Sequence, residues 1–106
     1  MYAVHHVLST NGLDIYQAWL DTIRDTRVKA RITTRVDRAA QGHFGVTEPV
    51  GDGVFEMKLD FGPGYRIYYA TIGRRIILLL GGGSKDRQQA DIEQARSLWR
   101  RHKVTL

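Results

Sequence analysis

The spacing of hydrophobic residues changes part-way along this chain, and the change limits the folds that the chain can form. From residue 54 to residue 61 the large apolar side chains occupy every second position, namely Phe55, Met57, Leu59 and Phe61. This period is typical of a strand that is buried on one face. Gly62-Pro63-Gly64 predicts a turn, and residues 65–70 alternate again, so a β-hairpin is expected here.

Helical spacing dominates the segments before and after this hairpin. Two apolar stripes, at residues 13–23 and 28–39, predict two helices joined by a short link as an antiparallel hairpin. Around them we expect a strand at 2–8, a glycine-rich loop at 42–53, a buried strand at 76–80 that ends at Gly81, and a last helix at 87–103. The expected order is β-α-α-β-β-β-α, an antiparallel sheet with helices packed on it, in the α+β class.

Length and composition restrict the function further. A chain of 106 residues has room for one domain, expected to span residues 1–106. Its 16 Lys and Arg against 11 Asp and Glu leave a formal charge of +5, which admits nucleic acid, phosphorylated ligands or an acidic protein as partners. Cysteine, a signal-peptide pattern and a long apolar run are all missing from the sequence. We therefore expect a cytoplasmic protein with no membrane partner.

Arginines recur along one side of the second predicted helix. They are Arg27, Arg31, Arg35 and Arg38, at spacings of four, four and three. This spacing places them on a common helix face, and Arg binds phosphate through two parallel hydrogen bonds. The pattern indicates either a track that binds RNA or the ribosome, or an ordinary solvated helix face.

Other basic residues are expected at one end of the sheet. Lys58 and Arg66 fall on the hairpin face opposite the large apolar residues, and Lys85 and Arg87 follow the last strand. Converging cations repel one another unless an anion binds among them. When a 2′-hydroxyl attacks the adjacent phosphorus of RNA, such cations stabilise the charge that grows on the phosphate, and a lysine can accept the proton. The alternative is a set of exposed basic side chains on an open sheet face.

The remaining motifs do not indicate a cofactor. His5 and His6 point to opposite faces of one strand, and no histidine spacing matches a zinc motif. The run from Gly81 to Lys85 lacks the Gly-Lys-Ser/Thr order of a phosphate-binding loop. We expect no metal and no cofactor.

Two long segments resemble a known family. They are PVGDGVFEMKL at residues 49–59 and FGPGYRIYY at residues 61–69, followed by LLLGGGSK at 78–85 and QQADI at 88–92. These segments resemble the HigB-like, phage-related addiction module killer proteins, a subgroup of the RelE/ParE toxin superfamily. The resemblance covers nearly the whole chain.

The resemblance implies a RelE-like microbial RNase fold and the toxin of a type II toxin–antitoxin module. It implies a metal-independent endoribonuclease, an mRNA interferase, that cuts mRNA on the ribosome and inhibits translation. Lys58 and Arg66 take the family's catalytic positions, and Lys85 and Arg87 take those after the last strand. The implied partners are the ribosome with its mRNA, and a cognate antitoxin, commonly a HigA-like helix-turn-helix protein that also binds operator DNA.

The sequence departs from the family at the proton donor. RelE carries a tyrosine near the start of its last helix, where this chain has Ile92, and His102 lies too far along the helix to replace the histidine of some HigB proteins. The donor to the leaving 5′-oxygen is therefore unassigned, with Lys85 and ribosomal RNA as alternatives. Two other functions also stay open, which are ParE-like inhibition of DNA gyrase and a non-catalytic module that binds its antitoxin and operator DNA.

Overall fold

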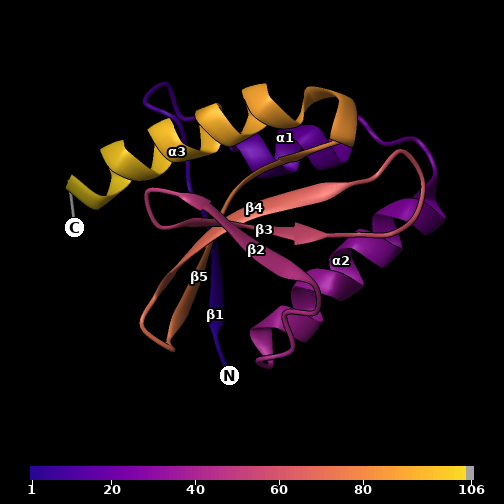
Figure 1. Cartoon of the computed structure of the whole chain (residues 1–106), viewed down its shortest axis with the longest axis horizontal. Helices are drawn as coiled ribbons and strands as arrows, with labels where there is room; N and C mark the ends of the chain where they lie inside the picture. The colour runs from indigo at the N-terminus through magenta and orange to yellow at the C-terminus, as the bar shows by residue number, and fades with distance from the viewer. Residues whose placement is uncertain (105–106) are drawn as a thin grey trace.

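A five-stranded sheet runs through the middle of the molecule, with helices on both of its faces (Figure 1). The computed structural model describes residues 1–104. Its elements, in chain order, are β1 (Ala3–His6), α1 (Ile15–Asp21), α2 (Thr26–Ala40), β2 (Thr47–Gly51), β3 (Val54–Lys58), β4 (Arg66–Ile72), β5 (Ile76–Gly83), the 3-10 turn η1 (Lys85–Arg87) and α3 (Gln88–Val104). The chain is one α+β domain with three α-helices among the described residues.

The sheet is mixed, so the expected wholly antiparallel sheet is wrong. The strands lie in the order β1-β5-β4-β3-β2, and all neighbours are antiparallel except β1 and β5. The parallel pair arises because the chain leaves β1, passes through both N-terminal helices and returns to the opposite edge at β2. Hydrogen bonds from Ala3 N to the Arg75 oxygen (2.8 Å) and from Val7 N to the Leu79 oxygen (3.0 Å) close this seam.

The segment expected as a loop at 42–53 contains the strand β2. Its Pro49 lies on the sheet edge, where the missing N–H faces no partner strand. Thr47 anchors β2 to the interior, because its hydroxyl lies 2.7 Å from the Tyr69 hydroxyl. The glycines and the proline of this segment predicted a loop, but they are also compatible with an edge strand. Such a strand needs N–H groups on one side only, and it does not need large side chains.

The last strand is longer than expected. We predicted that it ends at Gly81, but β5 continues to Gly83, and its glycines pair with residues 66–68 of β4. Backbone hydrogen bonds hold this end of the strand, so it needs no side chains to stay in the sheet. Because the glycines have no side chains, Trp19 lies directly beside Gly82 and Asp91 directly beside Gly83.

Each N-terminal helix begins after an aspartate. The carboxylate of Asp14 accepts a hydrogen bond from Gln17 N (3.0 Å), and that of Asp25 accepts one from Arg27 N (2.9 Å). These caps satisfy backbone donors of the first turn and fix where α1 and α2 start. Helix α1 therefore begins at Ile15, within the apolar stripe predicted at residues 13–23.

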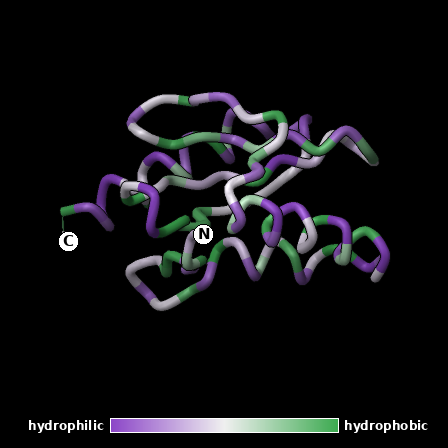
Figure 2. The backbone as a smooth tube through the Cα atoms, turned by 90° about the horizontal axis from the view of Figure 1, so that it is seen from below, coloured by the Kyte–Doolittle hydropathy of each residue, from purple (hydrophilic) through white to green (hydrophobic). Residues whose placement is uncertain are grey.

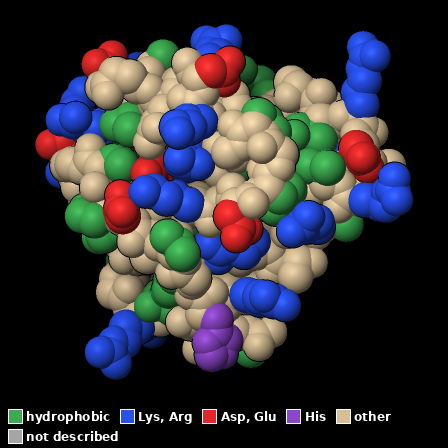
Figure 3. Space-filling view, turned by 45° about the vertical axis from the view of Figure 1, so that its right-hand side comes forward, with side chains coloured by type: hydrophobic (Ala, Val, Ile, Leu, Met, Phe, Trp, Pro, Cys, Tyr) green, Lys and Arg blue, Asp and Glu red, His purple; other side chains and the backbone are tan. Residues whose placement is uncertain are grey.

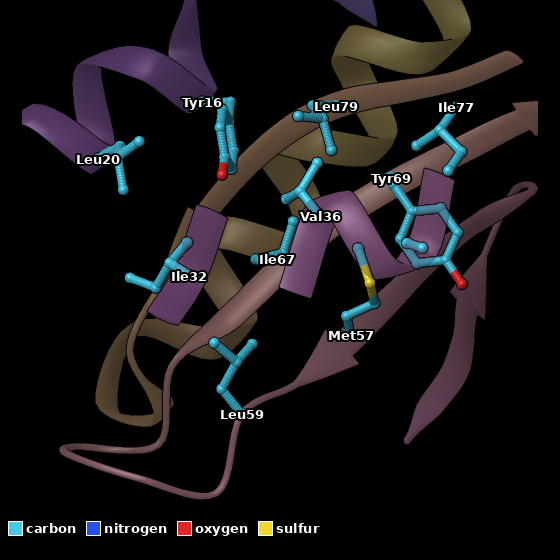
Figure 4. Close-up of a cluster of buried hydrophobic side chains, with 11 residues drawn as sticks. Tyr16, Leu20, Ile32, Val36, Met57, Leu59, Ile67, Tyr69, Ile77 and Leu79 are labelled. Carbon is cyan, nitrogen blue, oxygen red and sulfur yellow. The ribbon is translucent and has the colours of Figure 1, made fainter. Parts of the chain in front are cut away.

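Two apolar clusters pack against opposite faces of the sheet. Helices α1 and α2 cover one face, and Figure 4 shows Tyr16, Leu20, Ile32 and Val36 from these helices directed toward side chains of the central strands. Helix α3 covers the other face through Ala95, Leu98 and Trp99. Green and purple alternate along the helical coils in Figure 2, as expected for helices with one apolar side.

Asp52 fastens the β2–β3 turn to α3. It has φ of 58°, a left-handed conformation that Asp and Asn tolerate better than most residues. Its carboxylate accepts hydrogen bonds from Arg100 (2.6 Å) and Arg96 (3.2 Å), and these bonds lower the pKa of Asp52.

Replacing Asp52 by Asn is expected to lower the thermal midpoint by a few degrees at neutral pH. The native pKa is depressed, so the stabilisation is present above the pKa of the unfolded chain and is lost as pH falls through the native pKa. Thermal unfolding of both proteins across an acid series checks this. A difference that persists at the lowest pH would contradict it, because both side chains are then neutral.

Candidate functional site

Lys58 and Arg66 meet at one end of the sheet. They are cross-strand partners on β3 and β4, so their side chains leave the sheet on the same face, as the alternation predicts. Glu56 lies between them on this face. Its carboxylate is 3.8 Å from Nε of Arg66 and 4.0 Å from Nζ of Lys58.

Glu56 makes this end of the sheet a mixed cluster of charges. Its side chain is only 3% exposed, and the Gln88 amide of α3 donates a hydrogen bond to Oε1 (2.9 Å). On the other side Glu48 of β2 lies 3.1 Å from the Lys58 ammonium. The predicted cluster of cations therefore also contains two carboxylates, and the start of α3 covers Glu56.

Arg66 is buried more deeply than its place on the polar face indicates. Its side chain is 12% exposed, and Nη1 donates to the Gly64 oxygen at 2.9 Å. Its Nε and the Tyr68 hydroxyl are buried without a hydrogen-bond partner among residues 1–104. Burial, then Glu56 and Asp91, raise the pKa of Tyr68, and Arg66 opposes this rise. Buried polar groups without partners are uncommon, and their presence beside paired charges marks this end of the sheet as the candidate site.

Lys85 joins this cluster, whereas Arg87 does not. Lys85 N donates to the Pro63 oxygen (3.3 Å), which holds η1 against the β3–β4 turn. A methyl group on Gly64 would lie 3.1 Å from Cβ of Lys85 and 3.4 Å from Nη1 of Arg66, so these two side chains are neighbours. Arg87 instead lines a separate groove with Trp19 and Asp91.

Reasoning from sequence missed four residues of this region. Glu56 and Tyr68 were placed only as members of alternating strands, and Gln88 and Asp91 only as the start of a helix. The alternation did place Glu56 on the face of Lys58. No pattern showed that α3 crosses this face, because helix packing depends on contacts between distant segments.

The four arginines of the predicted track on α2 have different environments in the structure. Arg31 and Arg38 are exposed and line a groove of about 510 Å³ with the end of β3, and Arg27 is exposed at the start of the helix. The Arg31 guanidinium lies over the Phe61 ring, 3.8 Å from its centroid. Figure 3 shows that Lys and Arg side chains are numerous on this side of the molecule, with acidic side chains among them.

Arg35 has a structural role instead. Its Nη1 donates to the Phe44 oxygen (2.7 Å) and its Nη2 to the Lys58 oxygen (3.0 Å), which ties α2 to the end of β3. Burial, and then the neighbouring Arg38, lower the pKa of Arg35. The spacing that puts it on a common face with the other arginines is correct, but its donors face carbonyl oxygens of this chain.

Residues 1–104 offer neither a metal cluster nor a membrane span. No group of three His, Asp or Glu side chains in this part of the chain is arranged to hold a metal ion. No helix within it is long and apolar enough to cross a membrane.

Comparison with known proteins connects the chain to a protein of Haemophilus influenzae that is itself described as uncharacterized. The two are 40% identical over 83 residues, which cover 78% of this chain and 84% of the relative. The chain belongs to the same family as that protein. No family model and no solved structure matches the chain. The relative therefore shows family membership and indicates no chemistry.

Proposed function

We propose that this chain is the toxin of a type II toxin–antitoxin module, of the HigB-like subgroup of the RelE/ParE superfamily. In this proposal it is a cytoplasmic, ribosome-dependent mRNA endoribonuclease with an antitoxin of the HigA-like helix-turn-helix type, which also binds operator DNA. The placing of Lys58, Arg66 and Lys85 at one end of the sheet is the observation that supports it most. The RelE-like arrangement, with a helical hairpin on one face and a C-terminal helix on the other, is part of the proposal.

The proposed reaction is an internal transfer at phosphorus. The 2′-hydroxyl attacks the adjacent phosphorus and passes its proton to the neutral Lys85 amine, the bond to the 5′-oxygen breaks, and that oxygen takes a proton from Lys85. The products are a 2′,3′-cyclic phosphate and a 5′-hydroxyl. Arg66 and Lys58 hold the non-bridging oxygens, Lys85 is the exposed group for proton transfer, and Glu56 positions the two cations.

The test is brief expression of the chain in bacterial cells, followed by mapping of new RNA 5′ ends across the transcriptome. We expect ends inside translated regions, in phase with codons, that are lost in the Arg66→Ala variant. Intact messages in cells that stop growing would reject cleavage and favour a target such as DNA gyrase. Unchanged growth and unchanged ends would favour a module without catalytic activity.

The two exposed arginines that line the α2 groove lead to a separate prediction about RNA binding. Replacing Arg31 and Arg38 together by Ala should reduce the dependence of log affinity on log salt by about 1.4 for a single-stranded RNA oligonucleotide. The reason is that a protein which neutralises fewer phosphates displaces fewer counterions from the RNA when it binds. Alanine at Arg74 and Arg75, two exposed arginines in the β4–β5 turn, is the matched control and should leave the slope unchanged. Equal slopes in all three proteins would make the α2 arginines ordinary surface residues.

A further inference from the structure

A groove of about 730 Å³ opens beside the glycine end of β5. Strand β1 pairs with β5 only as far as Leu79, so the β5 edge beyond this residue has no strand next to it. Helix α1 forms one wall of the groove and the first turn of α3 forms the other. Gly82 and Gly83 lie between them, and because they have no side chains the Trp19 ring and the Asp91 carboxylate lie directly against the strand backbone.

One wall of the groove is aromatic. The Trp19 ring packs on Gly82, so closely that a methyl group there would lie 2.2 Å from a ring carbon. Tyr65, which follows the β3–β4 turn, lies with its ring centroid 6.1 Å from that of Trp19. Both side chains are half-buried and line the groove, so each offers part of a flat ring to a ligand.

The opposite wall carries a carboxylate that this chain does not pair. Asp91 is half-buried, lies against Gly83, and makes no hydrogen bond or ion pair among residues 1–104. Burial raises the pKa of Asp91, whereas the charge of Arg87 lowers it. Because Asp91 lines the groove, its oxygens are open to N–H donors of a ligand bound there.

We infer that this groove is a subsite for one unstacked base of single-stranded RNA, with guanine preferred. Guanine presents two adjacent N–H donors, N1 and the 2-amino group, on its Watson–Crick edge, and these match the two oxygens of Asp91. The base stacks on the Trp19 ring with the Tyr65 ring at its edge, and Arg87 is placed for a flanking phosphate. The inference rests on the proposed function for its substrate class, and it adds a base preference to the proposed cleavage.

The first experiment uses the indole N–H signals of the ¹⁵N-labelled chain. Trp19 lines the groove, while Trp99 is buried under α3 and reports on the overall fold. The probes are GMP, AMP, CMP and UMP, titrated separately. GMP should shift the Trp19 signal at the lowest concentration and leave that of Trp99 in place. Equal responses to all four nucleotides, or no response at saturating concentrations, would overturn the inference.

Asp91→Asn is the decisive variant, because it removes the acceptor charge with little change in size. It should reduce the preference for GMP over UMP by at least about fivefold. Glu93→Gln is the matched control, since Glu93 is an exposed acid on the same helix and does not line the groove. A preference that survives in Asp91→Asn, or that falls equally in Glu93→Gln, would contradict the assignment.

Mapping of RNA 5′ ends separates this inference from the proposed function. Cleavage by the wild type that is enriched at guanine, with the enrichment lost in Asp91→Asn, supports both. Cleavage without base preference supports the proposed nuclease and overturns the guanine subsite. Intact messages together with GMP binding at Trp19 overturn the nuclease and support the subsite.

Discussion

Replacing Arg66 by Ala is expected to lower mRNA cleavage by about 100-fold or more and to abolish growth arrest. Arg66 is the donor that reaches the charge cluster from β4, and its partner across the strands, Lys58, cannot offer two parallel hydrogen bonds to phosphate. The measurements are growth after induction and the yield of new RNA 5′ ends. The free energy of unfolding of the variant is measured as well, because this side chain is largely buried and its loss also affects stability.

The same substitution is expected to destabilise the fold by about 1–3 kcal/mol, since it removes a charge beside the buried Glu56. The double variant Glu56→Gln/Arg66→Ala separates the two effects. An amide tolerates the loss of the cation, so the double variant should recover much of the unfolding free energy and none of the cleavage. Recovery of both would show that Arg66 acts only as the structural partner of Glu56.

The sequence predicts part of the environment of the Arg66 side chain. The alternation of β3 and β4 predicts that Arg66 and Lys58 share a face, and the cross-strand register confirms this. It also suggests that Arg66 points away from the core, which is wrong, because α3 crosses this face and the side chain is 12% exposed. Periodicity within one element describes its two faces, but it carries no information about which distant helix covers them.

The errors in the sheet have a similar origin. Strand β2 was missed because Pro49 and the nearby glycines resemble a loop, although an edge strand accepts both. The parallel pairing of β1 with β5 was missed because no local pattern states which strands become neighbours. The assignments that are confirmed, such as the β3–β4 hairpin and α2, depend on contacts close in sequence and on strong periodicity.

The exposure of the α2 arginines was predicted correctly only where the side chain makes no hydrogen bond to the backbone of another element. Arg27, Arg31 and Arg38 remain exposed as the helical spacing indicates, but Arg35 is held by the Phe44 and Lys58 carbonyl oxygens. The four arginines look equivalent in the sequence. They differ in the structure because Arg35 donates hydrogen bonds to the carbonyl oxygens of Phe44 and Lys58, whereas Arg27, Arg31 and Arg38 stay exposed.

Gly82→Ala is expected to lower the free energy of unfolding by about 1–3 kcal/mol, the usual cost of overpacking a well-filled site. The added methyl group would lie 2.2–2.6 Å from three atoms of the Trp19 ring, and that ring is also held against Tyr16 and Tyr65. The ring therefore has to move with its surroundings. Denaturant unfolding of the variant measures the cost.

Gly83→Ala is the matched control, because Gly83 is the next residue of the same strand and has no left-handed backbone conformation either. Its methyl group would lie 2.0 Å from a carboxylate oxygen of Asp91, a short side chain that can turn into the groove, so the loss should be well under that of Gly82→Ala. Combining Gly82→Ala with Trp19→Leu should cost less than the sum of the two single changes, since the smaller side chain removes the clash. Strict additivity would mean that Trp19 does not rest on Gly82. The aromatic wall of the groove would then have no fixed position, because the contact with the bare glycine backbone is what places the Trp19 ring at this edge of the sheet.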